Sequence, residues 1–236
     1  IRDEFVKIIE SDNAYEGILL LEEVGLLQYI VPELREGIDV GQNLHHIYTV
    51  WEHNTRALKY AAEKKYSLED ELTIVEKSYK LLSLHLPEVS QQTGWLWEEI
   101  KKKANRLNTT VTKPSHRDFY DKQILVNGKK LSIIDWDTLC LADPALDLGN
   151  FSAHLKLRSL QNPALAQILN KAEKLLEQII ADLERKEILA NFRFYKLTAL
   201  FRLASLYSIR PLWHNLAPQL WKICEKEVFY KERSAR

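Results

Sequence analysis

Methionine is absent from the 236-residue sequence, and cysteine and glycine are scarce. A chain that begins at Ile1 and has no methionine is not expected to be an untouched translation product. Two cysteines are too few for a disulfide framework or a cysteine-rich metal site. No apolar run approaches the roughly 20 residues that a bilayer-spanning helix needs, and the charged start is unlike a secretory signal. We therefore expect a cytoplasmic protein with no membrane partner.

An excess of charge of one sign is also lacking, because 33 Lys and Arg residues balance 33 Asp and Glu residues. Strong binding to a nucleic-acid backbone relies on clustered basic side chains. The neutral total therefore excludes a global field that would recruit a polyanion, and any such site must be local. Hydrophobic residues make up 46% of the chain, which is enough to fill the core of one large domain or two small ones.

The first 66 residues show helical periodicity interrupted by turn-forming residues. Gly25 is predicted to form a helix C-terminal cap, and a longer helix is predicted from about Tyr48 to Lys65. The stretch from Glu63 to Glu71 is charged and poor in apolar residues. We therefore place a domain boundary there, between a helical segment at 1–66 and a second domain at 67–236.

The second domain is predicted to be helical apart from one β-hairpin. Asn127-Gly128 lies between two apolar runs and favours a two-residue type I′ turn, in which Val126 would pair with Lys129 and Gln123 with Ser132. The fold class is thus mostly α, within α+β. Helices are expected near 72–82 and 96–107, and over 145–157, 163–187, 188–209 and 216–231.

Three oxygen-bearing side chains are expected to converge beside this hairpin, namely Asp118, Gln123 and Asp135. The hairpin would fold Asp135 back toward the loop that carries Asp118. Phosphoryl transfer needs a carboxylate that orients the attacking hydroxyl and accepts its proton, together with hard oxygen ligands for Mg²⁺. The pattern therefore predicts phosphoryl-transfer chemistry.

Four motifs follow one another in this part of the chain, namely His116-Arg117-Asp118, the polar Gln123 five positions later, Ile134-Asp135-Trp136-Asp137, and Asp143-Pro144-Ala145-Leu146-Asp147. Together they resemble the C-terminal lobe of the aminoglycoside phosphotransferase and choline kinase family, and the likeness covers about residues 72–230. It implies a largely helical, protein-kinase-like C-lobe that uses ATP and Mg²⁺ to phosphorylate a hydroxyl of a small-molecule acceptor. The acidic site residues suit a cationic acceptor.

The resemblance assigns roles to single residues. Asp118 would be the catalytic base and Asp135 the main Mg²⁺ ligand, while Gln123 would occupy the second metal-ligand position. That position is usually Asn in the family, and glutamine keeps the amide oxygen but adds a methylene group.

Four further polar residues of these motifs are expected to support the site. His116 would stabilise the loop by hydrogen bonding. Asp137 is a candidate for a further carboxylate at or near the metal, and it ranks after Asp135. Asp143 and Asp147 are interpreted as loop-bracing or helix-capping carboxylates, because negative charge is favourable near a helix start.

Residues 1–66 contain a second series of motifs, namely Ile1-Arg2-Asp3-Glu4-Phe5, Gly25-Leu26-Leu27, Val31-Pro32-Glu33-Leu34, Gln42-Asn43-Leu44-His45-His46 and Val50-Trp51-Glu52-His53. They resemble a different family, the bacterial tRNA nucleotidyltransferases and poly(A) polymerases, in the helical neck and the opening of the HD-type metal domain. The likeness implies RNA contact by the N-terminal helices.

A residual HD-type metal site would use His46 and His53, which stand about two helical turns apart. The His-Asp doublet that should follow is replaced by His85-Leu86, so the ligand set is incomplete. A purely structural role for these histidines is the alternative.

A kinase of this type also needs an N-terminal lobe with a β-sheet, a phosphate-covering loop and a strand lysine. The sequence before Thr109 shows no β-rich segment, and its glycines are scattered. Three functions therefore remain open for the chain: an active phosphotransferase, an incomplete or inactive one, and an RNA-binding or tRNA-processing module.

Overall fold

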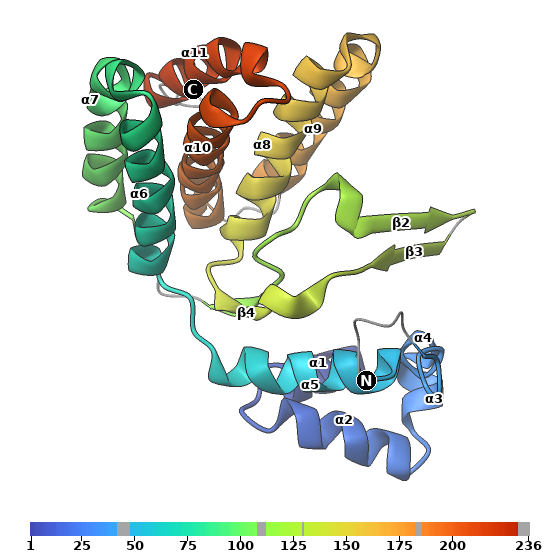
Figure 1. The fold of residues 1–236 in the computed structure, drawn as a ribbon. Helices are drawn as coiled ribbons and strands as arrows, with labels where there is room; N and C mark the ends of the chain where they lie inside the picture. Colours follow the sequence, from blue (N-terminus) through green and yellow to red (C-terminus); the bar gives the residue numbers. More distant parts are fainter. Residues whose placement is uncertain (42–47, 108–111, 129, 183–185, 231–236) are drawn as a thin grey trace. The chain divides into compact units, whose positions relative to one another are not determined.

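The computed structural model describes residues 1–41, 48–107, 112–128, 130–182 and 186–230 (Figure 1). The chain divides into two compact units, each described by itself below. The first unit combines 1–66 with 112–117 and 134–142, and the second combines 67–111, 118–133 and 143–236.

The first unit consists of short helices and one small sheet. Strand β1 (Lys113–Ser115) pairs antiparallel with β4 (Cys140–Ala142), and a single 3₁₀ turn, η2 (Trp136–Thr138), precedes β4. The main chain at Lys64, directly after the last of this unit's helices, joins the sheet, since the Leu141 amide donates to the Lys64 carbonyl over 2.9 Å. The helices are α1 (Arg2–Ile9), α2 (Ala14–Glu23), α3 (Leu27–Ile30), α4 (Pro32–Arg35) and α5 (Val50–Glu63).

Gly25 ends α2 as the sequence predicts. Its φ of 70° places it in the left-handed region, which costs glycine little. The Gly25 amide donates to the Glu22 carbonyl over 3.0 Å, and the Leu26 amide donates to the Leu21 carbonyl over 2.9 Å. This pair of bonds is a Schellman motif, which satisfies carbonyls at the helix end and turns the chain into α3.

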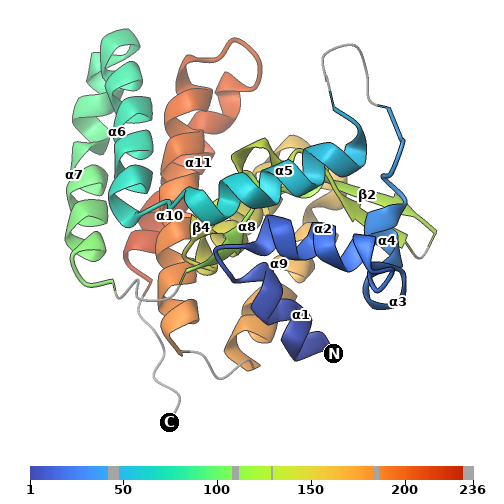
Figure 2. The same cartoon turned by 90° about the horizontal axis from the view of Figure 1, so that it is seen from below.

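The second unit is a helical bundle with a projecting hairpin. Helix α10 contacts α6, α8 and α11, and Figure 2 shows the bundle from below. The hairpin is formed by β2 (Ile124–Asn127) and β3 (Lys130–Ile133), and a 3₁₀ turn, η1 (Asp121–Gln123), leads into it. The helices are α6 (Leu68–His85), α7 (Pro87–Ala104), α8 (Ala145–Gln161), α9 (Ala166–Asp182), α10 (Lys186–Ile209) and α11 (Ala217–Val228).

Helix α6 begins with a reciprocal capping box. Ser67 Oγ accepts from the Asp70 amide over 3.2 Å, and the Asp70 carboxylate accepts from the Ser67 amide over 2.8 Å. Two amide donors that the helix itself leaves without partners are satisfied in this way, which fixes the first residue of the helix.

The core of the second unit is apolar around α10 but contains one buried cation. Lys196 is 3% exposed, and its ammonium lies 2.8 Å from Glu173 and 2.6 Å from Glu227. Burial alone would lower the pKa of Lys196, but these carboxylates outweigh it and raise the pKa. Burial likewise favours a higher pKa for Glu173, and the ion pairs with Lys196 and Lys156 reverse that effect. Both groups are therefore held charged.

The mostly helical fold with a small hairpin is confirmed, but the predicted hairpin register is wrong. Asn127 pairs with Lys130, and Ser132 lies opposite Leu125 rather than Gln123. The reason is that Asn127 is extended and belongs to β2, while Gly128 takes the positive φ of 60°. The β1–β4 pair was not predicted, because three-residue strands show no recognisable alternation.

Gly149 allows α8 to approach α10 closely. A Cβ atom at this position would lie 2.6 Å from the Lys196 amide nitrogen and 2.7 Å from the Tyr195 carbonyl carbon. We expect Gly149→Ala to lower the free energy of unfolding by about 1–3 kcal/mol, because backbone cannot yield as a flexible side chain can. Urea unfolding measures the effect, and Gly41→Ala is the control because a Cβ there has no heavy atom within 4 Å. Equal stability of the two variants would contradict close packing at this point.

Candidate phosphotransfer site

The loop from Asp118 to Gln123 lies along helix α8 in the second unit. Asn150 Nδ2 donates to the Phe119 carbonyl over 3.0 Å. Two turns further along α8, Arg158 Nε donates to both carboxylate oxygens of Asp121, over 3.0 and 2.9 Å. The loop is therefore held at both its start and its middle by side chains of one helix.

Ring contacts fill the interval between these two polar contacts. Phe119 stacks on Phe151 at 5.2 Å between ring centroids, and Tyr120 stacks on His154 at 4.5 Å. Burial, together with the positive charge of Arg202, lowers the pKa of His154 to about 4. The imidazole is therefore neutral at pH 7 and acts as a flat packing surface for Tyr120.

The spacing of the α8 residues explains why they can act together. Asn150, His154 and Arg158 are separated by four residues each, so their side chains lie on one face of the helix. Arg202 on α10 fixes the first of them, because its Nη2 donates to Asn150 Oδ1 over 2.9 Å. The hold on the loop therefore extends into the core of the unit.

Four of the predicted residues of the phosphotransfer motif lie in the second unit, namely Asp118, Gln123, Asp143 and Asp147. Asp118 is half-buried in this loop, and Gln123 is 4% exposed at the end of η1. The Gln123 amide donates to the Tyr120 carbonyl over 3.0 Å, which closes the turn that leads into β2.

The other predicted residues of the phosphotransfer motif, His116, Asp135 and Asp137, belong to the first unit. Asp135 has a φ of 67° and a ψ of 54°, in the left-handed region that few residues other than glycine adopt. Aspartate tolerates this conformation better than most residues, and such backbone is often found at functional positions. Its side chain is exposed.

His116 holds the segment around Asp135 in place. Its Nε2 donates to the Ile134 carbonyl over 2.8 Å, and its own carbonyl accepts from Thr138 Oγ1 over 2.6 Å. The imidazole also lies 4.9 Å from the Trp136 ring. These contacts bracket Asp135 on both sides along the chain.

Asp143 and Asp147 lie at the start of α8. Asp143 Oδ1 accepts from the Ala145 amide over 2.8 Å, and Oδ2 accepts from Asn191 Nδ2 over 2.6 Å. Burial raises the pKa of Asp143, and the two hydrogen bonds offset only part of that effect. Asp147 lies in the first turn of α8, where its negative charge interacts favourably with the positive end of the helix dipole.

The histidines proposed for an HD-type site are placed only in part. His46 lies outside the described residues. His53 on α5 pairs with Asp137, with Nε2 3.3 Å from Oδ1. Within the described ranges, no group of three or more His, Cys, Asp or Glu side chains is arranged to hold a metal ion.

Sequence reasoning missed the four residues that hold the loop, namely Asn150, His154, Arg158 and Arg202. A signal was available, because Asn150, His154 and Arg158 are polar residues at four-residue spacing and therefore lie on one face of the helix. Their partners are 31 to 37 positions away in sequence, so the spacing alone could not identify what they contact.

With this geometry in view, comparison with known proteins identifies the family. A model described as "Phosphotransferase enzyme family" matches residues 38–186, which is more than half of the chain and includes every motif residue from His116 to Asp147. The chain belongs to this family.

The beginning of the chain matches a different family model. A model described as "Probable RNA and SrmB- binding site of polymerase A" matches residues 1–38. An A-adding tRNA nucleotidyltransferase from Deinococcus radiodurans is 45% identical over 58 residues, which is 25% of this chain and 13% of that protein's length. No solved structure matches the chain.

None of the described helices is long and apolar enough to cross a membrane.

We expect Asn150→Ala to loosen the loop from Asp118 to Gln123, because a buried donor to the Phe119 carbonyl is removed. Loss of such a bond costs about 1–3 kcal/mol locally. Hydrogen–deuterium exchange of the peptide spanning the loop should accelerate by about tenfold or more, in line with that cost. Asn170→Ala is the matched control, since Asn170 accepts from Lys156 away from the loop. Unchanged loop exchange in Asn150→Ala would show that α8 does not hold the loop.

Proposed function

We propose that the chain acts as a kinase-like phosphotransferase that transfers the γ-phosphate of ATP to a hydroxyl group of a small molecule in a Mg²⁺-dependent reaction. The observation that carries this proposal is the family match over residues 38–186, because it contains the whole series of motifs from His116 to Asp147. The geometry of the individual loops supports it.

Asp118 is assigned the role of base, which orients the acceptor hydroxyl and accepts its proton. A base works only when its position is fixed to a fraction of an ångström relative to the substrate. The contacts of Phe119 and Asp121 with α8 supply such a fixed position for the residues that follow Asp118 directly. His116 is assigned to hold the segment that carries Asp135.

Asp135 and Gln123 are assigned as Mg²⁺ ligands. Their carboxylate and amide oxygens are of the hard type that Mg²⁺ prefers, and Asp135 is exposed, so the donor chemistry fits this ion. Bound Mg²⁺ would neutralise charge on the nucleotide phosphates. Protein sites commonly supply only one or two carboxylates to such an ion, with phosphates and water completing the shell. Asp137, paired with His53, would add negative charge near this site.

If Asp135 binds the metal–nucleotide complex, Mg-ATP should raise the melting temperature of the chain more than ATP alone does, and Asp135→Ala should abolish this Mg²⁺-dependent part of the rise. A ligand at 100 times its Kd stabilises a protein by about 2.7 kcal/mol, which is several degrees for a domain of this size. Differential scanning fluorimetry with ATP, with and without Mg²⁺, measures the effect. Asp12→Ala is the matched control, because Asp12 is an exposed carboxylate of the same unit. Absence of stabilisation of the wild-type chain at millimolar Mg-ATP would contradict the proposal.

RNA binding by the N-terminal helices is a second candidate function, proposed because the polymerase-type model matches residues 1–38 and the nucleotidyltransferase relative is 45% identical over 58 residues. Arg2 and Lys7 lie on α1, and the side chain of Lys7 is 70% exposed. These cations could contact a phosphate backbone.

Gel retardation of tRNA should then occur at low salt and weaken steeply as salt is added, because counterions are released on binding. The double variant Arg2→Gln with Lys7→Gln should bind more weakly. The slope of log affinity against log salt concentration should become smaller by about two, because two phosphate contacts are lost. Lys80→Gln is the control, since Lys80 is equally exposed in the second unit. Equal retardation by the double variant and the control would remove these helices as the RNA contact.

A further inference from the structure

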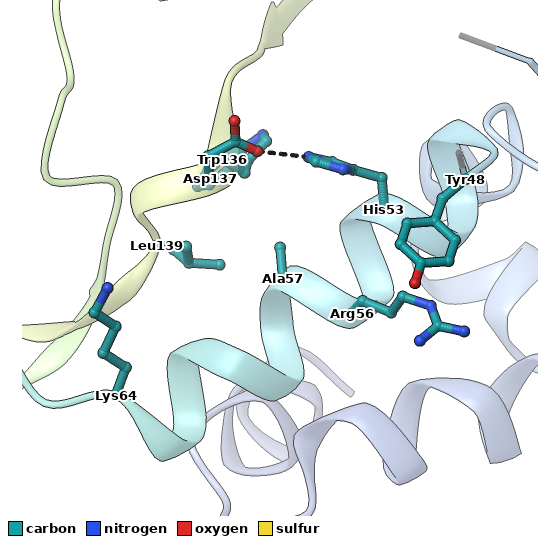
Figure 3. Close-up of a pocket in the computed structure, with 8 residues that line it drawn as sticks. All are labelled: Tyr48, His53, Arg56, Ala57, Lys64, Trp136, Asp137 and Leu139. Atoms are coloured by element: carbon teal, nitrogen blue, oxygen red, sulfur yellow. Dashed lines mark ion pairs between the residues drawn. The ribbon is translucent and has the colours of Figure 1, made fainter. Parts of the chain in front are cut away.

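The first unit contains a pocket that is lined by residues of helix α5 and by Trp136 and Asp137 of the phosphotransfer motif. Its volume is about 520 Å³, which lies in the range of small-molecule sites. Figure 3 shows it between helix α5 and the segment that runs from η2 toward β4.

The shape of the pocket follows from helix spacing. His53, Arg56 and Ala57 are three or four residues apart on α5, so one face of the helix presents all three to the pocket. Trp136 and Leu139 form the opposite wall. The alanine is small and leaves room between the two walls.

The main chain is fixed at the end of the pocket where Lys64 lies. Lys64 follows directly after α5, and its carbonyl accepts from the Leu141 amide over 2.9 Å. The Tyr66 amide donates in turn to the Leu141 carbonyl over 2.9 Å. Lys64 is thus fixed by its backbone, and its side chain has no ion pair or hydrogen bond among the residues that the structure describes.

Positive charge predominates in the lining. The Arg56 guanidinium lies 4.3 Å from the centroid of the Tyr48 ring, which attracts the cation without neutralising it. The single lining carboxylate, Asp137, is paired with His53. Glu52 lies one turn before Arg56, but its carboxylate accepts from the amide and hydroxyl of Thr49 over 3.0 and 3.1 Å. Besides His53, the lining carries two positive charges, on Arg56 and Lys64, and one negative charge, on Asp137.

Apolar side chains separate the two cations. In the view of Figure 3, Ala57 and Leu139 lie between Lys64 at one end and Arg56 with Tyr48 at the other. A planar ring can pack on Trp136, and a guanidinium can bind a phosphate through two parallel hydrogen bonds. The ligand that matches both features has an aromatic body and one phosphate group.

We propose that this pocket binds a nucleoside monophosphate, with the phosphate at Arg56 and the base against Trp136. Lys64 adds attraction for the negative charge. No metal ion is needed for this recognition, which separates it from the proposed phosphotransfer function. Asp137 is common to both sites, whereas Arg56 and Lys64 belong to this pocket alone.

Isothermal titration calorimetry of the full chain with adenosine 5′-monophosphate, in the presence of EDTA, tests the proposal. AMP should bind more tightly than either adenosine or inorganic phosphate, because each of these fills only half of the pocket. Raising the salt concentration should weaken binding, since both cations are partly exposed.

Substitutions locate the binding site. Arg56→Gln should weaken AMP binding by about tenfold or more, which is the usual loss for a charge-assisted hydrogen bond, and Lys64→Gln should weaken it by a smaller factor. Ala57→Leu should abolish binding by filling the pocket. Lys80→Gln in the second unit should bind as the wild-type chain does, and circular dichroism checks that each variant is folded.

Binding of AMP that is unchanged in Arg56→Gln and Ala57→Leu would overturn the proposal, as would no binding at millimolar AMP. Asp135→Ala should still bind AMP in EDTA. A chain that binds AMP but is not stabilised by Mg-ATP would therefore contradict only the phosphotransferase proposal. A chain that responds to Mg-ATP without binding AMP in EDTA would contradict only this one.

Discussion

Helix α8 is the element on which both the core and the candidate catalytic loop of the second unit depend. On one side it approaches α10 so closely that a Cβ atom at Gly149 would lie 2.6 Å from a backbone nitrogen. On another it holds the loop after Asp118 through Asn150 and Arg158. The position of the loop is therefore set by helix packing, and a change in the core is transmitted to the residues proposed to carry the chemistry.

The charges buried beside α10 impose a second constraint. Lys196 contacts Glu173 on α9 and Glu227 on α11, and Lys156 on α8 also pairs with Glu173. Burying such charges is expensive, and the pairing stabilises the unit only while every partner is present. An alternative packing of these four helices would leave a carboxylate or an ammonium buried alone. The network thus favours one arrangement of the helices around α10, including the position of α8.

Much of the fold could be predicted from sequence because it is encoded locally. Helical periodicity located the helices of the second unit, and Gly25 marked the end of α2. The hairpin was predicted, but its register was not, because Asn127-Gly128 can provide either two turn residues or one. The residues of the candidate site were identified by motif, whereas the contacts from α8 that position the loop depend on tertiary packing between distant segments. No local pattern specifies which residue Arg158 will reach.

The proposed phosphotransferase function depends on a working base at Asp118, in the loop that α8 holds. The most direct measurement is the Mg²⁺-dependent release of ADP from ATP, with wild-type chain and Asp118→Asn compared at equal concentration and in the presence of a pool of small alcohols and amino alcohols. We expect Asp118→Asn to be slower by about a hundredfold or more, which is the usual contribution of a positioned general base. Equal rates for the two proteins, or no turnover by the wild-type chain, would contradict it.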